Sequence, residues 1–139
     1  MSTIEENKAA VREFTKVFKN EHNVDVVDRL FAVNFRHNFK VQVAPGLAGF
    51  KAVGRMMNTA FPDVVVTEKD LIANENTVVE RSAASATHRG ELMGAPPTGK
   101  KCQWTEIHIY RFDDTGKIVE HWVEWSTFEL LTQLGIVKM

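Results

Sequence analysis

Apolar residues recur at helical spacing through the first sixty positions of the chain. The stripe of the first predicted helix consists of Ile4, Val11, Phe14 and Phe18. Two capping boxes fit the start of this helix, Ser2 with Glu5 and Thr3 with Glu6. A shorter second helix is predicted at residues 25–31, an irregular or extended link at 34–43, and a third helix at 47–60, which Pro62 ends.

Beyond Pro62 the apolar residues alternate, which is the period of strands. Four strands are predicted, at residues 64–73, 77–88, 101–112 and 117–124, with turns at 74–76 and 113–116 and a loop at 90–100 that is rich in glycine and proline. Ser126 and Glu129 form a capping box for a closing helix at 127–134, which Gly135 ends.

Helices followed by a meander of long antiparallel strands predict an α+β fold in a single domain of 139 residues, with the helices packed on one face of a curved sheet. A sheet that curls around the first helix leaves a cone with an open end, where a small organic ligand would bind. No glycine-rich phosphate loop follows a strand, so a nucleotide site has no support.

The net charge, the N-terminal sequence and the single cysteine indicate which partners and which cellular location to expect. Seventeen basic and eighteen acidic side chains give a net charge of −1 without charge runs, which disfavours nucleic acid as a partner. No window approaches a membrane span and the N-terminus has no signal-peptide pattern, so we expect a cytoplasmic protein that does not bind a membrane. The single cysteine, Cys102, is interpreted as a small apolar strand residue.

The turn at residues 113–116 sets a register for the last hairpin. A three-residue loop with Gly116 in a left-handed bulge position predicts four facing pairs: Tyr110 with Glu120, His108 with Trp122, Glu106 with Glu124, and Trp104 with Ser126. A loop of two or four residues would shift the register by one and pair His108 with His121.

Both faces of this hairpin are too apolar for open water. We assign the face with Glu106, His108 and Glu124 to the inside of the cone. The opposite face carries Ile107, Ile109, Val123 and Trp125. We expect that face to be covered by the sheet of a second subunit, because large apolar patches rarely stay bare on a monomer. A homodimer through the sheet follows.

Proton transfer is the chemistry that the inner face would support. Two opposed carboxyls, Glu106 and Glu124, disfavour double ionisation in an apolar pocket, so at least one pKa should be raised, and His108 on the same face would complete an acid–base pair. In the alternative, both glutamates lie at the rim of the cone, where they are solvated or paired with Arg81 or Lys117. His108 then only makes hydrogen bonds in the core.

Two further histidines are weaker candidates. His37 in the link and His88 at the end of a strand would reach the mouth of the pocket, although a surface or core histidine is the commoner case. A metal site built from Glu106, His108 and another histidine lacks a further ligand motif, so no metal is expected.

Several longer motifs carry a family resemblance. They are Phe61-Pro62-Asp63, the run at 87–100 (THRGELMGAPPTGK), the segment at 116–122 (GKIVEHW) and the tail at 130–135 (LLTQLG). With the three-helix start, they resemble the SnoaL-like polyketide cyclases, also called ester cyclases, of the nuclear transport factor 2-like (NTF2-like) superfamily. The resemblance implies a cone with an apolar pocket, a dimer or tetramer, and ring closure by intramolecular aldol condensation without a cofactor.

One position departs from the family pattern. Members commonly have Trp, three residues and then Asp at the end of the last strand, whereas here Ser126 follows Trp122. Glu124, about 7 Å back along the strand, would then supply the missing carboxyl. Two hypotheses follow. The first is a cyclase-like or isomerase-like enzyme whose base is Glu124 or the Glu106–His108 pair, with Trp104, Tyr110 and Trp122 as pocket walls. The second is a non-catalytic protein that binds a small molecule.

Overall fold

The computed structural model describes residues 1–38 and 44–138. Helix α1 (Ile4–Phe14) continues into a π-helical segment, η1 (Thr15–Asn20), and a short turn, η2 (Val24–Val26), leads into α2 (Val27–Leu30). Strand β1 (Phe31–His37) and helix α3 (Gly46–Ala60) follow. The remaining elements are β2 (Val65–Ala73), β3 (Thr77–Thr87), β4 (Lys101–Phe112), β5 (Ile118–Trp125) and α4 (Thr127–Gln133).

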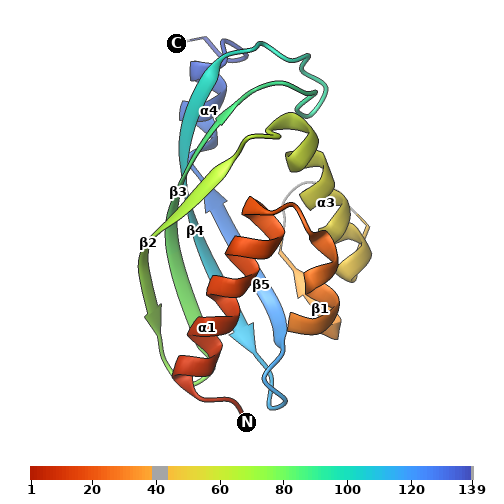
Figure 1. Cartoon of the computed structure of the whole chain (residues 1–139), viewed down its shortest axis with the longest axis vertical. Helices are drawn as coiled ribbons and strands as arrows, with labels where there is room; N and C mark the ends of the chain where they lie inside the picture. The colour runs from red at the N-terminus through yellow and green to blue at the C-terminus, as the bar shows by residue number, and fades with distance from the viewer. Residues whose placement is uncertain (39–43, 139) are drawn as a thin grey trace.

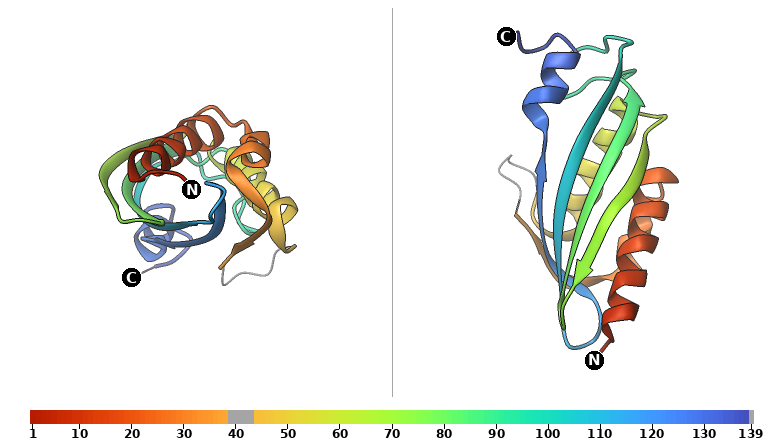
Figure 2. Two further views of the ribbon diagram at one scale, coloured as in Figure 1. Left: turned by 90° about the horizontal axis from the view of Figure 1, so that it is seen from below. Right: turned by 90° about the vertical axis from the view of Figure 1, so that its left-hand side faces the viewer.

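Within the described residues, five strands form one curved sheet in the order β1-β5-β4-β3-β2. Of its four strand pairs, β1–β5 is parallel and the other three are antiparallel. Helices α1 and α3 lie in front of this sheet in Figure 1, and the view from below in Figure 2 shows the strands curving round so that the helices close the remaining side. The predicted α+β fold, with helices on one face of a curved sheet, is confirmed.

Strand β1 is the element that the sequence pattern does not predict. Its residues 34–37 belong to the predicted irregular or extended link, and residues 39–43 of that link lie outside the described residues. The pairing explains the difference: Phe31 lies opposite Ile118, but the next pair joins Arg36 to Glu120 across an irregularity. Such an interrupted strand has no clean alternation of buried and exposed residues.

The first helix is anchored at both ends. Thr3 and Glu6 form the capping box at its start, one of the two boxes predicted. At the other end Asn20 pairs with the backbone of β2, because its Nδ2 donates to the Val66 carbonyl at 3.0 Å and its Oδ1 accepts from the Val66 N–H at 2.7 Å. The last turn of this helix is thereby held against the sheet.

The described residues form two apolar clusters in the interior. The first is rich in phenylalanine and includes Phe14, Phe18, Phe31, Phe35 and Phe50. The second includes Phe61, Trp104, Leu130 and Leu134. It also includes Cys102, which is buried on β4 and agrees with the prediction of a small apolar strand residue. Helix α3 lies close to the first cluster because Gly54 has no side chain: a Cβ there would lie 2.4 Å from the Phe18 ring.

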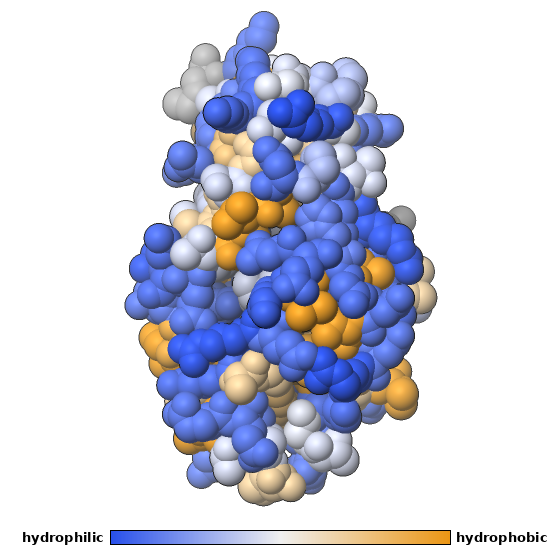
Figure 3. All heavy atoms as spheres, in the orientation of Figure 1, coloured by the Kyte–Doolittle hydropathy of each residue, from blue (hydrophilic) through white to orange (hydrophobic). Residues whose placement is uncertain are grey.

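The outer surface is mostly hydrophilic on the face that carries the helices, as expected when the apolar side chains pack inward (Figure 3). This face, over α1 and α3, also has separate apolar patches (Figure 3). Within the described ranges, no helix combines the length and apolar character that crossing a membrane requires.

The β4–β5 hairpin starts in the predicted register and then leaves it. Phe112 pairs with Ile118, which continues the register of the turn, where Gly116 has a φ of 82°. The next pair, however, joins Arg111 to Glu120, so Val119 is an extra residue on β5 and forms a β-bulge. Every pair beyond the bulge is shifted by one.

This shift exchanges the two faces of β5. His108 lies opposite Val123 instead of Trp122, and Glu106 lies opposite Trp125. The predicted pairs of His108 with Trp122 and of Glu106 with Glu124 are therefore wrong, as is the alternative of His108 with His121. The inner face of β4 is as predicted, because a bulge on β5 leaves the alternation of β4 unchanged.

Candidate functional site

A cavity of about 90 Å³ lies between the sheet and the helices, where the two apolar clusters meet. Its wall is almost entirely apolar and includes Phe14, Phe18, Phe50, Phe61, Val123 and Trp125. Four ionisable side chains also line it: Lys19, Glu106, His108 and His121. These four titratable side chains therefore lie at the wall of a cavity that is otherwise apolar.

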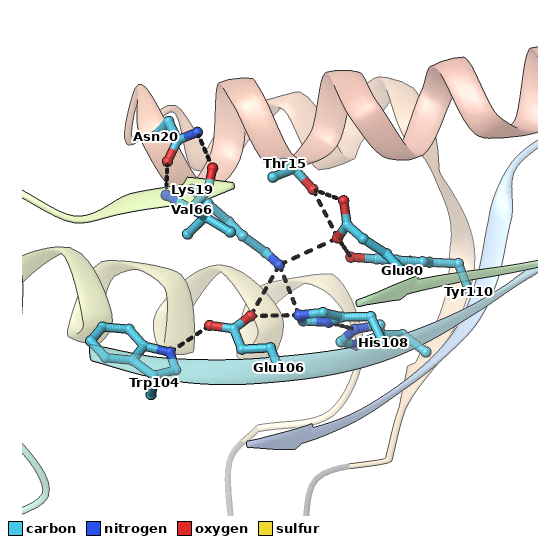
Figure 4. Close-up of polar contacts among 10 residues, drawn as sticks. Thr15, Lys19, Asn20, Val66, Glu80, Trp104, Glu106, His108 and Tyr110 are labelled. Atoms are coloured by element: carbon cyan, nitrogen blue, oxygen red, sulfur yellow. Dashed lines mark hydrogen bonds and ion pairs between the residues drawn. The ribbon is translucent and has the colours of Figure 1, made fainter. Parts of the chain in front are cut away.

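Lys19, Glu106 and His108 form a compact polar group (Figure 4). Lys19 reaches from η1 toward β4, and its Nζ lies 3.3 Å from Oε1 of Glu106 and 2.9 Å from Nε2 of His108. Oε1 of Glu106 lies 2.5 Å from the same Nε2. Because Glu106 and His108 are each 3% exposed, the three groups are desolvated and hold one another in place.

Two more rings extend this group. The indole Nε1 of Trp104 donates to Oε2 of Glu106 at 2.7 Å, so both carboxylate oxygens have a partner. On the other side, Nδ1 of His108 lies 2.8 Å from Nε2 of His121, and the two imidazoles stack with centroids 5.1 Å apart. The result is a continuous chain from Trp104 through Glu106 and His108 to His121.

A second buried carboxylate, Glu80, lies behind the hydrogen-bonded series from Trp104 to His121. Glu80 accepts hydrogen bonds from Oγ1 of Thr15, at 3.1 and 2.9 Å, and from the Tyr110 hydroxyl at 3.5 Å. Its Oε1 lies 3.9 Å from Nζ of Lys19. Lys19 therefore balances two carboxylates from two different strands.

The surroundings set the charge of each group. Burial on its own raises the pKa of Glu106, but the charge of Lys19 and the hydrogen bonds from His108 and Trp104 outweigh it, and the pKa is lowered to about 2. Burial, followed by the charge of Lys19, lowers the pKa of His108. Burial also lowers the pKa of His121 well below its ordinary value. At neutral pH the site contains a carboxylate beside two neutral imidazoles.

Comparison with known proteins identifies the family. A family profile described as SnoaL-like polyketide cyclase matches residues 8–134. The chain is a member of the SnoaL-like family. A search of curated proteins gave no match.

Solved structures of similar proteins agree with the SnoaL-like assignment. AclR from Streptomyces galilaeus, a candidate hydroxylase, is 30% identical, with 98% of this chain and 100% of AclR covered and a TM-score of 0.86. IdmH from Streptomyces antibioticus, a candidate polyketide cyclase, is 28% identical, with 93% and 98% covered and a TM-score of 0.78. A SnoaL-like protein from Jannaschia sp. CCS1 has a TM-score of 0.89 at 17% identity, with 99% and 97% covered, and shows the common fold.

Within this SnoaL-like fold, Trp104, Glu106 and His108 line the cavity, as the alternation of β4 predicts. The other predicted ionisable partner does not: Glu124 is exposed on the outer face of the sheet. The expected pair of opposed carboxyls is absent, and the expected rise in a carboxyl pKa is wrong for Glu106. Its neighbour is a lysine, which favours the carboxylate.

The predicted walls are also corrected. Trp122 lies on the outer face, where the Arg111 guanidinium covers its ring at 4.9 Å, and Val123 and Trp125 line the cavity in its place. Tyr110 is fully buried behind His108, with their rings stacked 5.6 Å apart, and does not line the cavity.

The remaining candidates take structural roles. His88 is buried, and its Nδ1 accepts a hydrogen bond from the N–H of Thr98. It therefore fixes the loop after β3 and does not line the cavity. His37 lies 3.3 Å from the Ala44 carbonyl and does not line the cavity. Ser126 makes no cap for α4. Its Oγ accepts from the N–H of Thr105 instead.

Sequence reasoning missed Lys19, His121 and Trp125 at the cavity wall. Lys19 follows Thr15 by four residues, so the two share one face of the helix, but the sequence does not show that this face meets Glu80 and Glu106. Among the residues that the structure describes, no group of three or more His, Cys, Asp or Glu side chains is placed to hold a metal ion.

Proposed function

We propose that this SnoaL-like protein is a cyclase or isomerase that removes a proton next to the carbonyl group of a small apolar substrate. The observation that supports the proposal is the chain of Glu106, His108 and His121 at the wall of an apolar cavity. Neutral imidazoles are suitable bases near pH 7, and the Glu106 carboxylate stabilises the imidazolium that forms.

The proposed step moves one proton and one electron pair. His108, or His121 hydrogen-bonded to it, takes a proton from the carbon beside the carbonyl, and the C–H electron pair moves to give an enolate with its charge on the carbonyl oxygen. In a cyclase the enolate carbon then attacks a second carbonyl of the same molecule, the π pair of that carbonyl moves to its oxygen, and the resulting alkoxide takes the proton back from the imidazolium. In an isomerase the ketone carries a β,γ double bond, and the conjugated dienolate takes the proton back at its γ-carbon. The cavity contributes by holding the reacting atoms together.

The size of the cavity limits the substrate. About 90 Å³ is well below the roughly 300–1,000 Å³ of pockets that enclose drug-sized ligands. A polyketide-sized substrate therefore requires side chains to move, and the unbranched Met57 at the wall is suited to this. A single-ring or two-ring ketone needs less movement.

A second candidate function is binding without catalysis. It is favoured by the last strand, where Ser126 occupies the position of the usual family acid and Glu124 points away from the cavity. In this case the polar group of Lys19, Glu106 and His108 would serve stability alone.

Hydrogen exchange at a model ketone separates the two functions. We expect the wild-type protein in D₂O to accelerate loss of the α-hydrogen NMR signals of 2-tetralone above the buffer rate. Because the pKa of His108 lies below its ordinary value, the rate should hold down to about pH 6.5 and fall at lower pH, where the base is protonated. Saturable binding of 2-tetralone without acceleration would favour the binding protein.

We also propose a homodimer through the outer face of the sheet. This face carries Ile107, which is 48% exposed, with Ile109 and Trp122 half-buried beside it. Trp122 takes the place that the sequence prediction gave to Trp125. Apolar surface of this kind is usually covered by another protein surface.

Sedimentation velocity at micromolar concentration tests the dimer. We expect wild-type protein to sediment as a dimer and Ile107→Lys as a monomer, because the lysine charge would be desolvated in the interface. Val33→Lys is the matched control: Val33 is 95% exposed on β1, and its variant should remain dimeric. A monomeric wild type would refute the proposed interface.

A further inference from the structure

The three tryptophans of the chain differ in how their indole N–H groups are used. Trp104 donates to Glu106 at 2.7 Å, and Trp122 lies on the outer face beneath Arg111. The Nε1 of Trp125, in contrast, is buried and has no hydrogen-bond partner among the described residues. Trp125 lines the cavity.

The position of Trp125 is well defined by its neighbours. Its Cα pairs with that of Glu106 across the β4–β5 hairpin, and its ring stacks on Trp104 at 5.7 Å with an interplanar angle of 22°. Trp125 therefore belongs to the same wall as Glu106 and His108. It reaches this wall only because the bulge at Val119 shifts the register.

A buried donor without an acceptor is unfavourable, and folded proteins retain few of them. Those that remain at a ligand cavity are commonly satisfied by the ligand or by a water molecule. Asn58 on α3 is a second polar side chain at this wall. An apolar cavity wall with a hydrogen-bond donor that has no partner in the protein suits an apolar ligand that carries an oxygen acceptor.

We propose that the indole N–H of Trp125 binds an oxygen acceptor of the ligand and so selects carbonyl-bearing molecules over hydrocarbons of the same shape. The inference rests on the proposed function for the identity of the ligand. In the proposed reaction the same donor would lie at the oxygen on which the enolate charge develops, where a fixed hydrogen-bond donor stabilises the transition state. Trp125 is then a binding residue that also orients the substrate.

The three indole N–H signals in a ¹H–¹⁵N NMR spectrum test the inference directly. The probes are acetophenone and α-methylstyrene, which share one shape but differ in C=O against C=CH₂. Acetophenone should move the Trp125 indole proton downfield, and α-methylstyrene should leave it in place while both probes shift the amide signals of cavity residues. Assignment follows from Trp125→Phe and Trp122→Phe.

Affinities of the same probes give a second readout. Trp125→Phe should weaken acetophenone binding by about 2- to 10-fold, the loss expected for one neutral hydrogen bond, with α-methylstyrene changed less than about 2-fold. Trp122→Phe, the matched control on the outer face, should change neither. Should Trp125→Phe fail to fold, the indole signals of the wild-type protein are assigned from their NOEs to neighbouring residues, and the shift of the Trp125 signal remains the test.

The outcomes are distinct. Equal indole shifts with both probes, no shift despite binding, or a donor occupied by a buried water alone would overturn the role of Trp125. Failure of both probes to bind would also overturn it, together with the apolar ligand cavity. A carbonyl-selective shift in a protein that does not accelerate 2-tetralone exchange would support Trp125 while refuting the enzymatic function.

Discussion

Replacing His108 by glutamine is expected to slow 2-tetralone exchange by about 10²- to 10⁴-fold at pH 7.5, the usual contribution of a general base. Glutamine retains hydrogen-bonding atoms near Glu106 and Lys19 but cannot accept a proton. The imidazole of His121 would also lose its partner at 2.8 Å. The rate is followed by ¹H NMR in D₂O, and urea denaturation reports whether the variant is folded.

The matched control is Glu124→Gln. Glu124 is the first candidate base from the sequence, yet it is exposed on the outer face of β5. The exchange rate of this variant should equal that of the wild type within about 2-fold, since surface substitutions away from a site have small effects. If Glu124→Gln were slow and His108→Gln were not, the acid–base role would belong to the outer face and the cavity would not be the site.

Replacing Lys19 by methionine is expected to lower the free energy of unfolding by about 3–5 kcal/mol at pH 7.5, the usual effect of removing one partner from a buried ion pair. The variant removes the cation that lies 3.3 Å from Glu106 and 3.9 Å from Glu80, both of which are buried. Urea denaturation measures the change. Lys16→Met is the control: the exposed Lys16–Glu21 pair should contribute less than about 1 kcal/mol.

The loss of unfolding free energy caused by Lys19→Met, called the deficit below, should become smaller at acidic pH. In the wild type the pKa of Glu106 is about 2, against an ordinary value of 4.5, so its contribution to stability is present above about pH 4.5 and is lost as the pH falls toward 2. Without Lys19 that pKa rises, because the charge that lowers it most is gone. The deficit should therefore shrink as the pH falls below about 4.5. An equal deficit at pH 7.5 and pH 4 would indicate lost packing rather than lost charge.

Much of the fold could be predicted because the local patterns are strong. The strand at residues 101–112 alternates over its full length, and its bounds in the structure are those predicted. The same alternation puts Trp104, Glu106 and His108 on one face of the strand, and in the structure all three line the cavity. Strand β1 was missed because its pairing with β5 is interrupted and joins distant parts of the chain.

The rest of the site depends on contacts that a single sequence does not display. A lysine beside Phe18 on an amphipathic helix suggests a solvent-facing residue, and burying Lys19 requires two carboxylates that lie more than sixty positions later in the chain. Turn chemistry identifies the first pair of the last hairpin, but it contains no signal for an extra residue two positions further along. Glu124, Trp122 and Trp125 were therefore assigned to the wrong faces.

The bulge at Val119 has a consequence for how the last strand tolerates a change in length. Deletion of Val119 would remove the bulge and leave Glu120 opposite Arg111, so His121, Val123 and Trp125 would keep their places on the inner face. If the same number of residues were instead paired without a bulge, Trp122 and Glu124 would point toward the ligand. The distance of a residue from the turn, counted along the chain, therefore does not by itself decide whether its side chain meets a substrate.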